Sequence, residues 1–259
     1  MGLEVLLTND DGIDSPGFRA LYDALCDVAE VTAVAPANDQ SAVGRAMSDE
    51  VTVEEHDLGY AIAGTPADCV VAGLEALGPY PDLVIAGCNT GANLGAYVLG
   101  RSGTVSAAVE AAFCGIPSMA VSLYLPEDEW PRETDAEDYV EACRATRYLV
   151  ENAIDSGVFK QAEYLNVNAP LPDEDGNPAS MAITHPSTVY EMGATYEEGS
   201  ITLHDRSWDA MASGNIADPE GTDRRALVEG KVSVSPLTAP HTTEHHDALD
   251  ALAESYDSD

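Results

Sequence analysis

The N-terminal segment of the chain places two acidic residues at the end of an apolar strand. Residues 3–7 are mostly leucine and valine, over a length typical of a buried strand in a parallel sheet. Asp10 and Asp11 follow, and Ser15 with Pro16 is a typical helix start. The carboxylates therefore lie where a first strand gives way to a first helix, which is the edge where open α/β sheets bind ligands.

Two interpretations of this acidic pair are open. Aspartate often forms turns because its side chain bonds to the nearby backbone. Adjacent carboxylates also repel each other unless a cation or a proton offsets their charge, so the pair is equally typical of a divalent-cation site.

Strands and helices alternate through the first two thirds of the chain. Further strands are predicted at 31–35, 51–53, 60–62, 83–86, 118–123 and 164–167, and helices at 66–77, 107–113 and 135–154. From residue 173 the pattern changes to strands at 181–184 and 200–203 with no helix between them, and a last strand at 232–237. We therefore expect an α/β fold: a Rossmann-like, mostly parallel sheet with helices on both faces over 1–172, and a smaller β-rich part with a C-terminal tail over 173–259.

Three more loops follow predicted strands or begin helices at this edge. The loop after the second strand holds Ser41, where a hydroxyl is most often a turn former. Residues 65–68 have the spacing of a capping box, which is a structural role. Residues 87–95 contain three glycines and two asparagines, Asn89 and Asn93, and so expose backbone to a ligand.

A fourth segment at the edge combines small and hydroxyl residues at a helix start, Ser102, Gly103 and Thr104. Free N–H groups, the helix dipole and two hydroxyls suit such a start to phosphate binding. An ordinary hydroxyl cap explains the same residues, so the motif alone leaves both roles open.

The charge composition excludes one class of partner. The chain has 46 acidic and 11 basic residues and a net charge of −35. Such a surface repels phosphate backbones and anionic membranes, so we expect neither a nucleic-acid scaffold nor a membrane partner. The acidic residues are dispersed and the hydrophobic fraction is 45%, which predicts a folded, salt-requiring protein of halophilic type.

The cysteines and the chain start bear on the cellular location. No signal-like segment precedes the first strand and no apolar run approaches a membrane span, so we expect the cytoplasm. The cysteines are odd in number and lack C-x-x-C spacing, so we expect mostly buried free thiols rather than disulfides or zinc ligands. They are Cys26, Cys69, Cys88, Cys114 and Cys143.

Taken in order, the motifs resemble those of the SurE family of metal-dependent nucleotide phosphatases. The segments that carry the resemblance are 9–12 with 15–17, 35–36 with 40–41, 64–69, and 87–95 with 102–105. Any one of them is weak evidence, whereas the ordered set is specific. The resemblance is strong over roughly the first 122 residues and resumes at 220–223 and 232–237.

The resemblance implies a set of site residues. It makes Asp10, Asp11, Ser41 and Asn89 the ligands of one divalent ion per subunit, with Asp10 and Asp11 catalytic. Oxygen ligands that include two carboxylates suit Mg²⁺ or Mn²⁺. The same resemblance implies that the phosphate is bound by Asn93, Ser102, Gly103 and Thr104.

The implied activity is hydrolysis of nucleoside monophosphates, at the 5′ and also the 3′ position, by a water that the metal orients and acidifies. Asp10 is the preferred acceptor of the water's proton, and direct attack by an aspartate ranks lower. The implied assembly is a homodimer or homotetramer that exchanges C-terminal elements. The alternative function is a nucleotide-binding module without catalysis. A dinucleotide oxidoreductase is disfavoured because no G-x-G-x-x-G follows the first strand.

Two positions depart from the family pattern. Arg101 stands where the family usually has an aromatic residue, and we expect it either to contact phosphate or to pair with surface acids. Residues 42–45 also differ from the usual small and polar run, so a nucleotide preference is not inherited.

Overall fold

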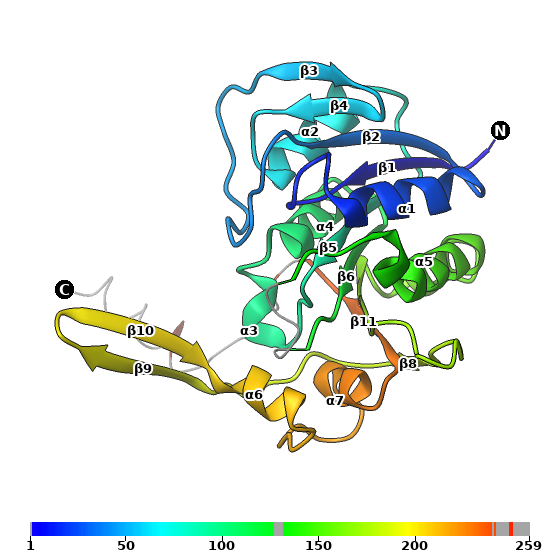
Figure 1. The fold of residues 1–259 in the computed structure, drawn as a ribbon. Helices are drawn as coiled ribbons and strands as arrows, with labels where there is room; N and C mark the ends of the chain where they lie inside the picture. Colours follow the sequence, from blue (N-terminus) through cyan, green and yellow to red (C-terminus); the bar gives the residue numbers. More distant parts are fainter. Residues whose placement is uncertain (1, 127–131, 240, 242–248, 251–259) are drawn as a thin grey trace.

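The computed structural model describes residues 2–126, 132–239, 241 and 249–250, and within them one sheet of nine strands organises the fold (Figure 1). In order across the sheet the strands are β3 (Val53–His56), β4 (Gly59–Ile62), β2 (Glu30–Pro36), β1 (Glu4–Thr8), β5 (Leu83–Thr90), β6 (Ser118–Leu123), β7 (Tyr164–Ala169), β11 (Val232–Leu237) and β8 (Met181–Ile183). From β4 to β7 every neighbouring pair is parallel, whereas β3 and β11 run antiparallel to β4 and β7. The predicted α/β fold with a mostly parallel sheet is confirmed.

Two pairs of helices cover opposite faces of this sheet (Figure 1). The helices α1 (Pro16–Cys26) and α5 (Val140–Ala153) pack on the face to which Leu7 points. On the other face, α2 (Pro66–Glu75) and α4 (Gly103–Phe113) pack around Leu6. Adjacent strand residues bury opposite faces because side chains alternate along a strand. This two-sided burial explains the nearly continuous apolar strands of the sequence.

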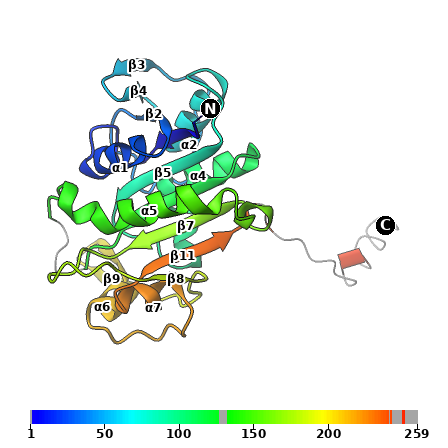
Figure 2. The same cartoon turned by 90° about the vertical axis from the view of Figure 1, so that its right-hand side faces the viewer.

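The C-terminal part contributes to the main sheet and also forms a separate ribbon. β8 and β11 complete the edge of the main sheet, so the sheet itself continues past residue 173. β9 (Met192–Glu197) and β10 (Ser200–Asp205) form a two-stranded antiparallel sheet that projects from the body (Figure 1). Two short helices, α6 (Arg206–Ala212) and α7 (Asp223–Val228), were not expected, and they lie at the end of the molecule opposite β3 (Figure 2).

Several element boundaries differ from the prediction. β5 runs on to Thr90 across a register shift, and the short helix α3 (Ala96–Leu99) follows it. The predicted helix 135–154 begins as a 3₁₀ turn, η2 (Ala136–Tyr139), which leads into α5. A second 3₁₀ turn, η3 (Val158–Lys160), precedes β7. These differences arise at element ends, where local patterns are least informative.

The expectation for the cysteines was half right. All five are free thiols, but Cys26 and Cys114 are exposed, and Cys69 and Cys88 are the buried ones. Cys26 is the last residue of α1, and Cys114 is the C-cap of α4. Both cysteines are exposed because these two helix ends lie at the protein surface. The expectation of mostly buried thiols is therefore wrong.

Two sequence expectations concern the tail and the membrane. The expected C-terminal tail falls largely on residues 242–248 and 251–259, which lie outside the described residues. Across the described part of the chain, every helix is too short or too polar to cross a bilayer.

Candidate metal and phosphate site

The loop after β1 holds the two aspartates at the carboxyl edge of the sheet. The Asn9 amide donates to the carbonyl of Gly12 at 2.8 Å and to the Ser15 hydroxyl at 3.0 Å, which closes the loop onto α1. Ser15 caps α1 as predicted. Asp10 is buried, with 3% of its surface exposed, and Asp11 is partly buried. The local sequence thus builds a rigid turn that presents two adjacent carboxylates.

The start of α4 lies directly against Asp10. The Thr104 hydroxyl donates to Oδ1 of Asp10, and the Thr104 main-chain N–H also bonds to this carboxylate. A Cβ added to Gly103 would lie 2.7 Å from the Cβ of Asp10, so this approach requires glycine. Ser102 is the N-cap, and its hydroxyl accepts from the N–H of Val105 at 3.0 Å. One predicted cation ligand, Asp10, therefore lies against the predicted phosphate-binding helix start.

The acidic pair concentrates negative charge in a poorly solvated place. Burial, and then the charge of Asp10, raises the pKa of Asp11 to about 7 although the Thr90 N–H donates to its Oδ2 at 2.8 Å. Burial likewise raises the pKa of Asp10 against the hydrogen bonds from Thr104. Each carboxylate is thus costly to ionise without a counter-charge, and a bound cation would supply one. This environment fits a divalent metal ion.

Ser41 and Asn89 reach the same edge from β2 and β5. The main-chain N–H of Gln40 donates to the carbonyl of Asp10 at 2.7 Å, which joins the two loops. The Asn89 side-chain nitrogen donates to the carbonyl of Gly91 at 2.5 Å, which leaves Oδ1 as the amide atom available to a cation. Within the described residues no three His, Cys, Asp or Glu side chains are placed to hold a metal ion together, so a metal here would need neutral oxygens beside the two carboxylates.

Sequence reasoning missed Asp39. Its Oδ1 accepts both the main-chain N–H and the hydroxyl of Ser41, at 2.7 and 2.6 Å. Its charge also helps to raise the pKa of both Asp10 and Asp11. Asp39 therefore orients a candidate ligand and adds a third negative charge near the pair. The available signal was an Asp two residues before a Ser, which is typical of a side-chain-closed turn.

Asn93 is held by β6 and β7. Its main-chain N–H donates to the Asn168 side chain at 2.8 Å, and its carbonyl accepts from Asn166 and Asn168 at 2.9 and 3.2 Å. Its own amide nitrogen donates to the Ser122 hydroxyl at 3.0 Å. The backbone of this loop is therefore rigid, and the two β7 asparagines that hold it were not singled out from the sequence. A phosphate contact by Asn93 stays a prediction.

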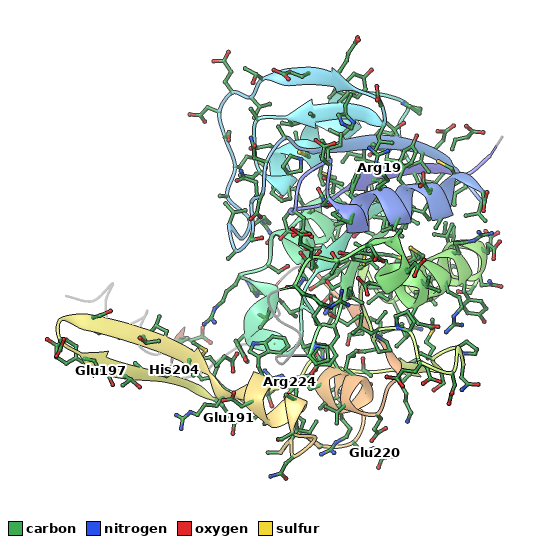
Figure 3. The ribbon with its side chains drawn as sticks, in the orientation of Figure 1. Arg19, Glu191, Glu197, His204, Glu220 and Arg224 are labelled. Carbon is green, nitrogen blue, oxygen red and sulfur yellow. The ribbon has the colours of Figure 1, made fainter. Side chains whose placement is uncertain are left out.

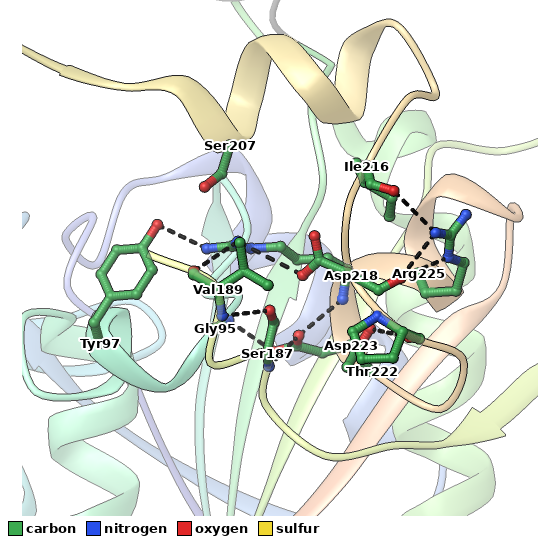
Figure 4. A network of polar contacts seen from close by, with 12 residues as sticks. Gly95, Tyr97, Ser187, Val189, Ser207, Ile216, Asp218, Thr222, Asp223 and Arg225 are labelled. Carbon is green, nitrogen blue, oxygen red and sulfur yellow. Dashed lines mark hydrogen bonds and ion pairs between the residues drawn. The ribbon is translucent and has the colours of Figure 1, made fainter. Parts of the chain in front are cut away.

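The loop that carries Asn93 is also fixed from the C-terminal part (Figure 4). Asp223 accepts from the N–H of Gly95 at 2.7 Å and from the N–H of Ser187 at 2.9 Å. The neighbouring Arg224 is buried, donates to the Tyr97 hydroxyl at 2.7 Å and lies 3.6 Å from an oxygen of Asp218. Asp223, in the motif at 220–223, thus fixes the backbone of the loop that carries Asn93.

Arg101 lies beside the helix start with its guanidinium carbon 5.4 Å from the ring centre of Tyr97. The side chain is exposed, and the described residues offer it no ion pair at salt-bridge distance. The acidic-surface partner that was one of the two expectations is therefore not found among them. A phosphate contact by Arg101 stays a prediction.

Comparison with known proteins shows which family and which proteins the chain is similar to. The chain matches the family described as "Survival protein SurE" over residues 5–191. It is 64% identical over 259 residues to "5′-nucleotidase SurE" of Haloarcula marismortui, covering 98% of this chain and 96% of that protein. It is 62% identical over 253 residues to the protein of the same name in Halobacterium salinarum, covering 98% of each.

The fold agrees with a solved structure as well. A crystal structure of the SurE protein from Aquifex aeolicus aligns with a TM-score of 0.76 and 30% identity, covering 99% of this chain and 100% of that one. The likeness therefore includes the C-terminal part, beyond the residues that the family match covers. By its ordered motifs, its full-length relatives and its fold, this chain belongs to the SurE family.

Proposed function

We propose that this protein is a metal-dependent phosphomonoesterase that hydrolyses nucleoside 5′-monophosphates to nucleoside and phosphate. The observation that carries the proposal is the contact between Asp10 and the start of α4, because it joins a cation-binding carboxylate to a phosphate-binding helix start. The naming of two relatives, at 64% and 62% identity, as 5′-nucleotidases supports the substrate class. Activity on 3′-monophosphates belongs to the same proposal.

In this proposal Asp10, Asp11, Ser41 and Asn89 would hold one Mg²⁺ or Mn²⁺ per subunit. When bound, such an ion offsets charge on the phosphoryl oxygens and lowers the pKa of a water. The oxygen-only donor set and the raised pKa values of the acidic pair support this choice.

The residues at the start of α4 have two different roles, orienting the Asp10 carboxylate and binding the phosphoryl group. The hydroxyl and the N–H of Thr104 are both engaged by Asp10, so they orient this carboxylate. The carboxylate of Asp10 is then the group that accepts the proton of the attacking water. The Ser102 hydroxyl accepts from Val105 and keeps its own proton to donate, so Ser102 and the N–H of Gly103 bind the phosphoryl oxygens that gain charge. Asn93 supplies a further donor.

The β9–β10 ribbon supports assembly into a homodimer or homotetramer. Ile201 pairs with Tyr196 across the ribbon and Leu203 pairs with Ala194, so one face of the ribbon is apolar. Ile201, Leu203 and Tyr196 are 63%, 70% and 71% exposed. Figure 3 shows the ribbon standing clear of the body, with Glu197 and His204 on it. Two strands alone are marginally stable, so a second subunit that covers this face would stabilise the ribbon.

The test is phosphate release from a panel of nucleoside 5′- and 3′-monophosphates in molar salt. Release that requires added Mn²⁺ or Mg²⁺ and stops on chelation is the expected result. Inosine, adenosine, guanosine and pyrimidine nucleotides at equal concentration would then establish the preferred base. A folded protein that releases no phosphate with either metal would favour the alternative function, a nucleotide-binding module without catalysis.

Assembly is tested by light scattering after size-exclusion chromatography in the same salt. Leu203→Glu places a charge in the centre of the apolar face, and we expect it to shift the protein towards the monomer. Thr202→Glu, on the opposite face of the same strand, is the matched control. A wild-type protein that is monomeric at all concentrations would contradict the assembly.

A further inference from the structure

We propose that Tyr139 is a positioning residue for the metal-binding carboxylate of Asp11 and that it acts through Thr90. The inference rests on the function proposed above, because it concerns the same site. It adds a residue from η2, at the far end of the loop that follows β6, to a site otherwise built from β1, β2, β5 and α4.

A short chain of hydrogen bonds joins Tyr139 to the acidic pair. The Tyr139 hydroxyl is 2.6 Å from the hydroxyl of Thr90, the last residue of β5. The main-chain N–H of Thr90 donates to Oδ2 of Asp11 at 2.8 Å. The second bond of the Tyr139 hydroxyl is to Thr134, at 2.7 Å. Tyr139 is thus connected to the metal-binding carboxylate through one intervening residue, Thr90.

The position of the Tyr139 hydroxyl is fixed from several sides. The side chain is fully buried, and a Cβ added to Gly17 in α1 would lie 2.7 Å from its ring. Burial raises the pKa of Tyr139 to about 12, so the hydroxyl stays protonated. The segment before it is held by the ion pair of Arg132 with Asp138, at 2.6 Å, and by the capping box that Asp138 completes with Asp135. The hydroxyl therefore has little freedom to move.

This arrangement determines which oxygen of Asp11 faces a cation. With Oδ2 engaged by Thr90, Oδ1 is the oxygen left for the metal. Loss of the Tyr139 hydroxyl would remove the hydrogen bond that holds the Thr90 side chain, and so loosen the residue whose main-chain N–H fixes Oδ2 of Asp11. Partners that orient metal ligands in this way are worth about 10- to 100-fold in metal affinity. A phenylalanine at position 139 would keep the ring packing, so the hydroxyl itself is what the role requires.

The test is Mn²⁺ binding to the substrate-free protein in molar salt, measured from the electron paramagnetic resonance signal of free Mn²⁺. For Tyr139→Phe we expect at least tenfold weaker binding than for the wild type. Hydrolysis should need correspondingly more Mn²⁺ for half-maximal rate, with kcat at saturating Mn²⁺ largely recovered. A merely structural role would lower the melting temperature and reduce kcat at every Mn²⁺ concentration, which would overturn the proposal.

Two further variants sharpen the result. Tyr164→Phe is the matched control, because Tyr164 is a buried tyrosine whose burial also raises its pKa to about 12 but which lies on β7 away from Thr90. Its Mn²⁺ affinity should equal that of the wild type. Thr90→Val should reproduce the defect, and the double variant with Tyr139→Phe should be no worse than either single variant.

The outcomes separate this inference from the proposed function. A wild-type protein that binds Mn²⁺ and hydrolyses nucleotides, with a folded Tyr139→Phe variant of unchanged affinity, overturns the role of Tyr139 alone. A folded wild type that neither binds Mn²⁺ nor hydrolyses any nucleotide overturns both.

Discussion

The hydroxyl of Thr104 donates a hydrogen bond to Oδ1 of Asp10 across 94 positions of sequence. The contact joins the first residues of α4 to the loop after β1, and the missing side chain of Gly103 permits it. A hydroxyl proton used by Asp10 is not available to a phosphate group at the same time, and a phosphate contact by Thr104 stays a prediction.

Thr104→Val should therefore impair the carboxylate rather than substrate binding alone. Removing a donor to a buried carboxylate costs about 1–3 kcal/mol. We expect a lower free energy of unfolding and a reduced kcat, measured by denaturant titration and by phosphate release. Thr104→Ser keeps the hydroxyl and should retain most of both. Equal loss in the two variants would contradict the assigned hydrogen bond.

Asp10→Asn should abolish turnover while the fold is kept. The amide oxygen of asparagine still accepts from Thr104, but it binds a cation weakly and accepts no proton. We expect at least an approximately hundredfold loss of kcat, within the range of about 10²–10⁴ typical of general bases. Removing one of two neighbouring negative charges should leave the melting temperature unchanged or raised. Asp14→Asn, on the same loop but exposed, is the control, and normal activity of Asp10→Asn would refute the assignment.

The ion pair of Asp138 with Arg132 predicts a pH dependence of stability. The hydrogen bond from Arg132 lowers the pKa of Asp138 below its ordinary 3.8. A carboxylate with a depressed folded-state pKa stabilises the protein above its unfolded pKa, and this contribution is lost as the pH falls through the folded-state value. Asp138→Asn should thus cost about 0.5–1 kcal/mol at neutral pH. The difference from the wild type should vanish in acid below that pKa, as followed by denaturant titration at several pH values. A constant difference would contradict the ion pair.

Salt should stabilise the protein over an unusually wide range. A net charge of −35 on 259 residues produces strong self-repulsion, and at about 1 M salt the screening length falls to roughly 3 Å. We expect the melting temperature to rise continuously from millimolar to molar KCl. The relatives from Haloarcula marismortui and Halobacterium salinarum agree with such an adaptation. A protein that stays folded and monodisperse in millimolar salt would contradict it.

The sequence was sufficient where the deciding interactions are local. Ser15 caps α1, and Thr65 with Asp68 forms the predicted capping box of α2, because both bonds span only a few residues. The alternation of apolar segments likewise predicted the parallel sheet, and the parallel sheet brings the ends of β1, β2 and β5 to one edge. The grouping of the candidate ligands followed from the topology alone.

Tertiary structure decided everything that depends on packing between distant segments. The use of Thr104 by Asp10, the bond between Tyr139 and Thr90 across 49 positions, and the pairing of β11 with β7 leave no local pattern in the chain. Burial is a further example, because it sets the raised pKa of Asp11 and depends on the layers that surround the loop. Residue type and spacing thus determined which side chains reach the ligand edge, whereas the packing of helices on the sheet decided which atoms of those side chains remain free for a ligand.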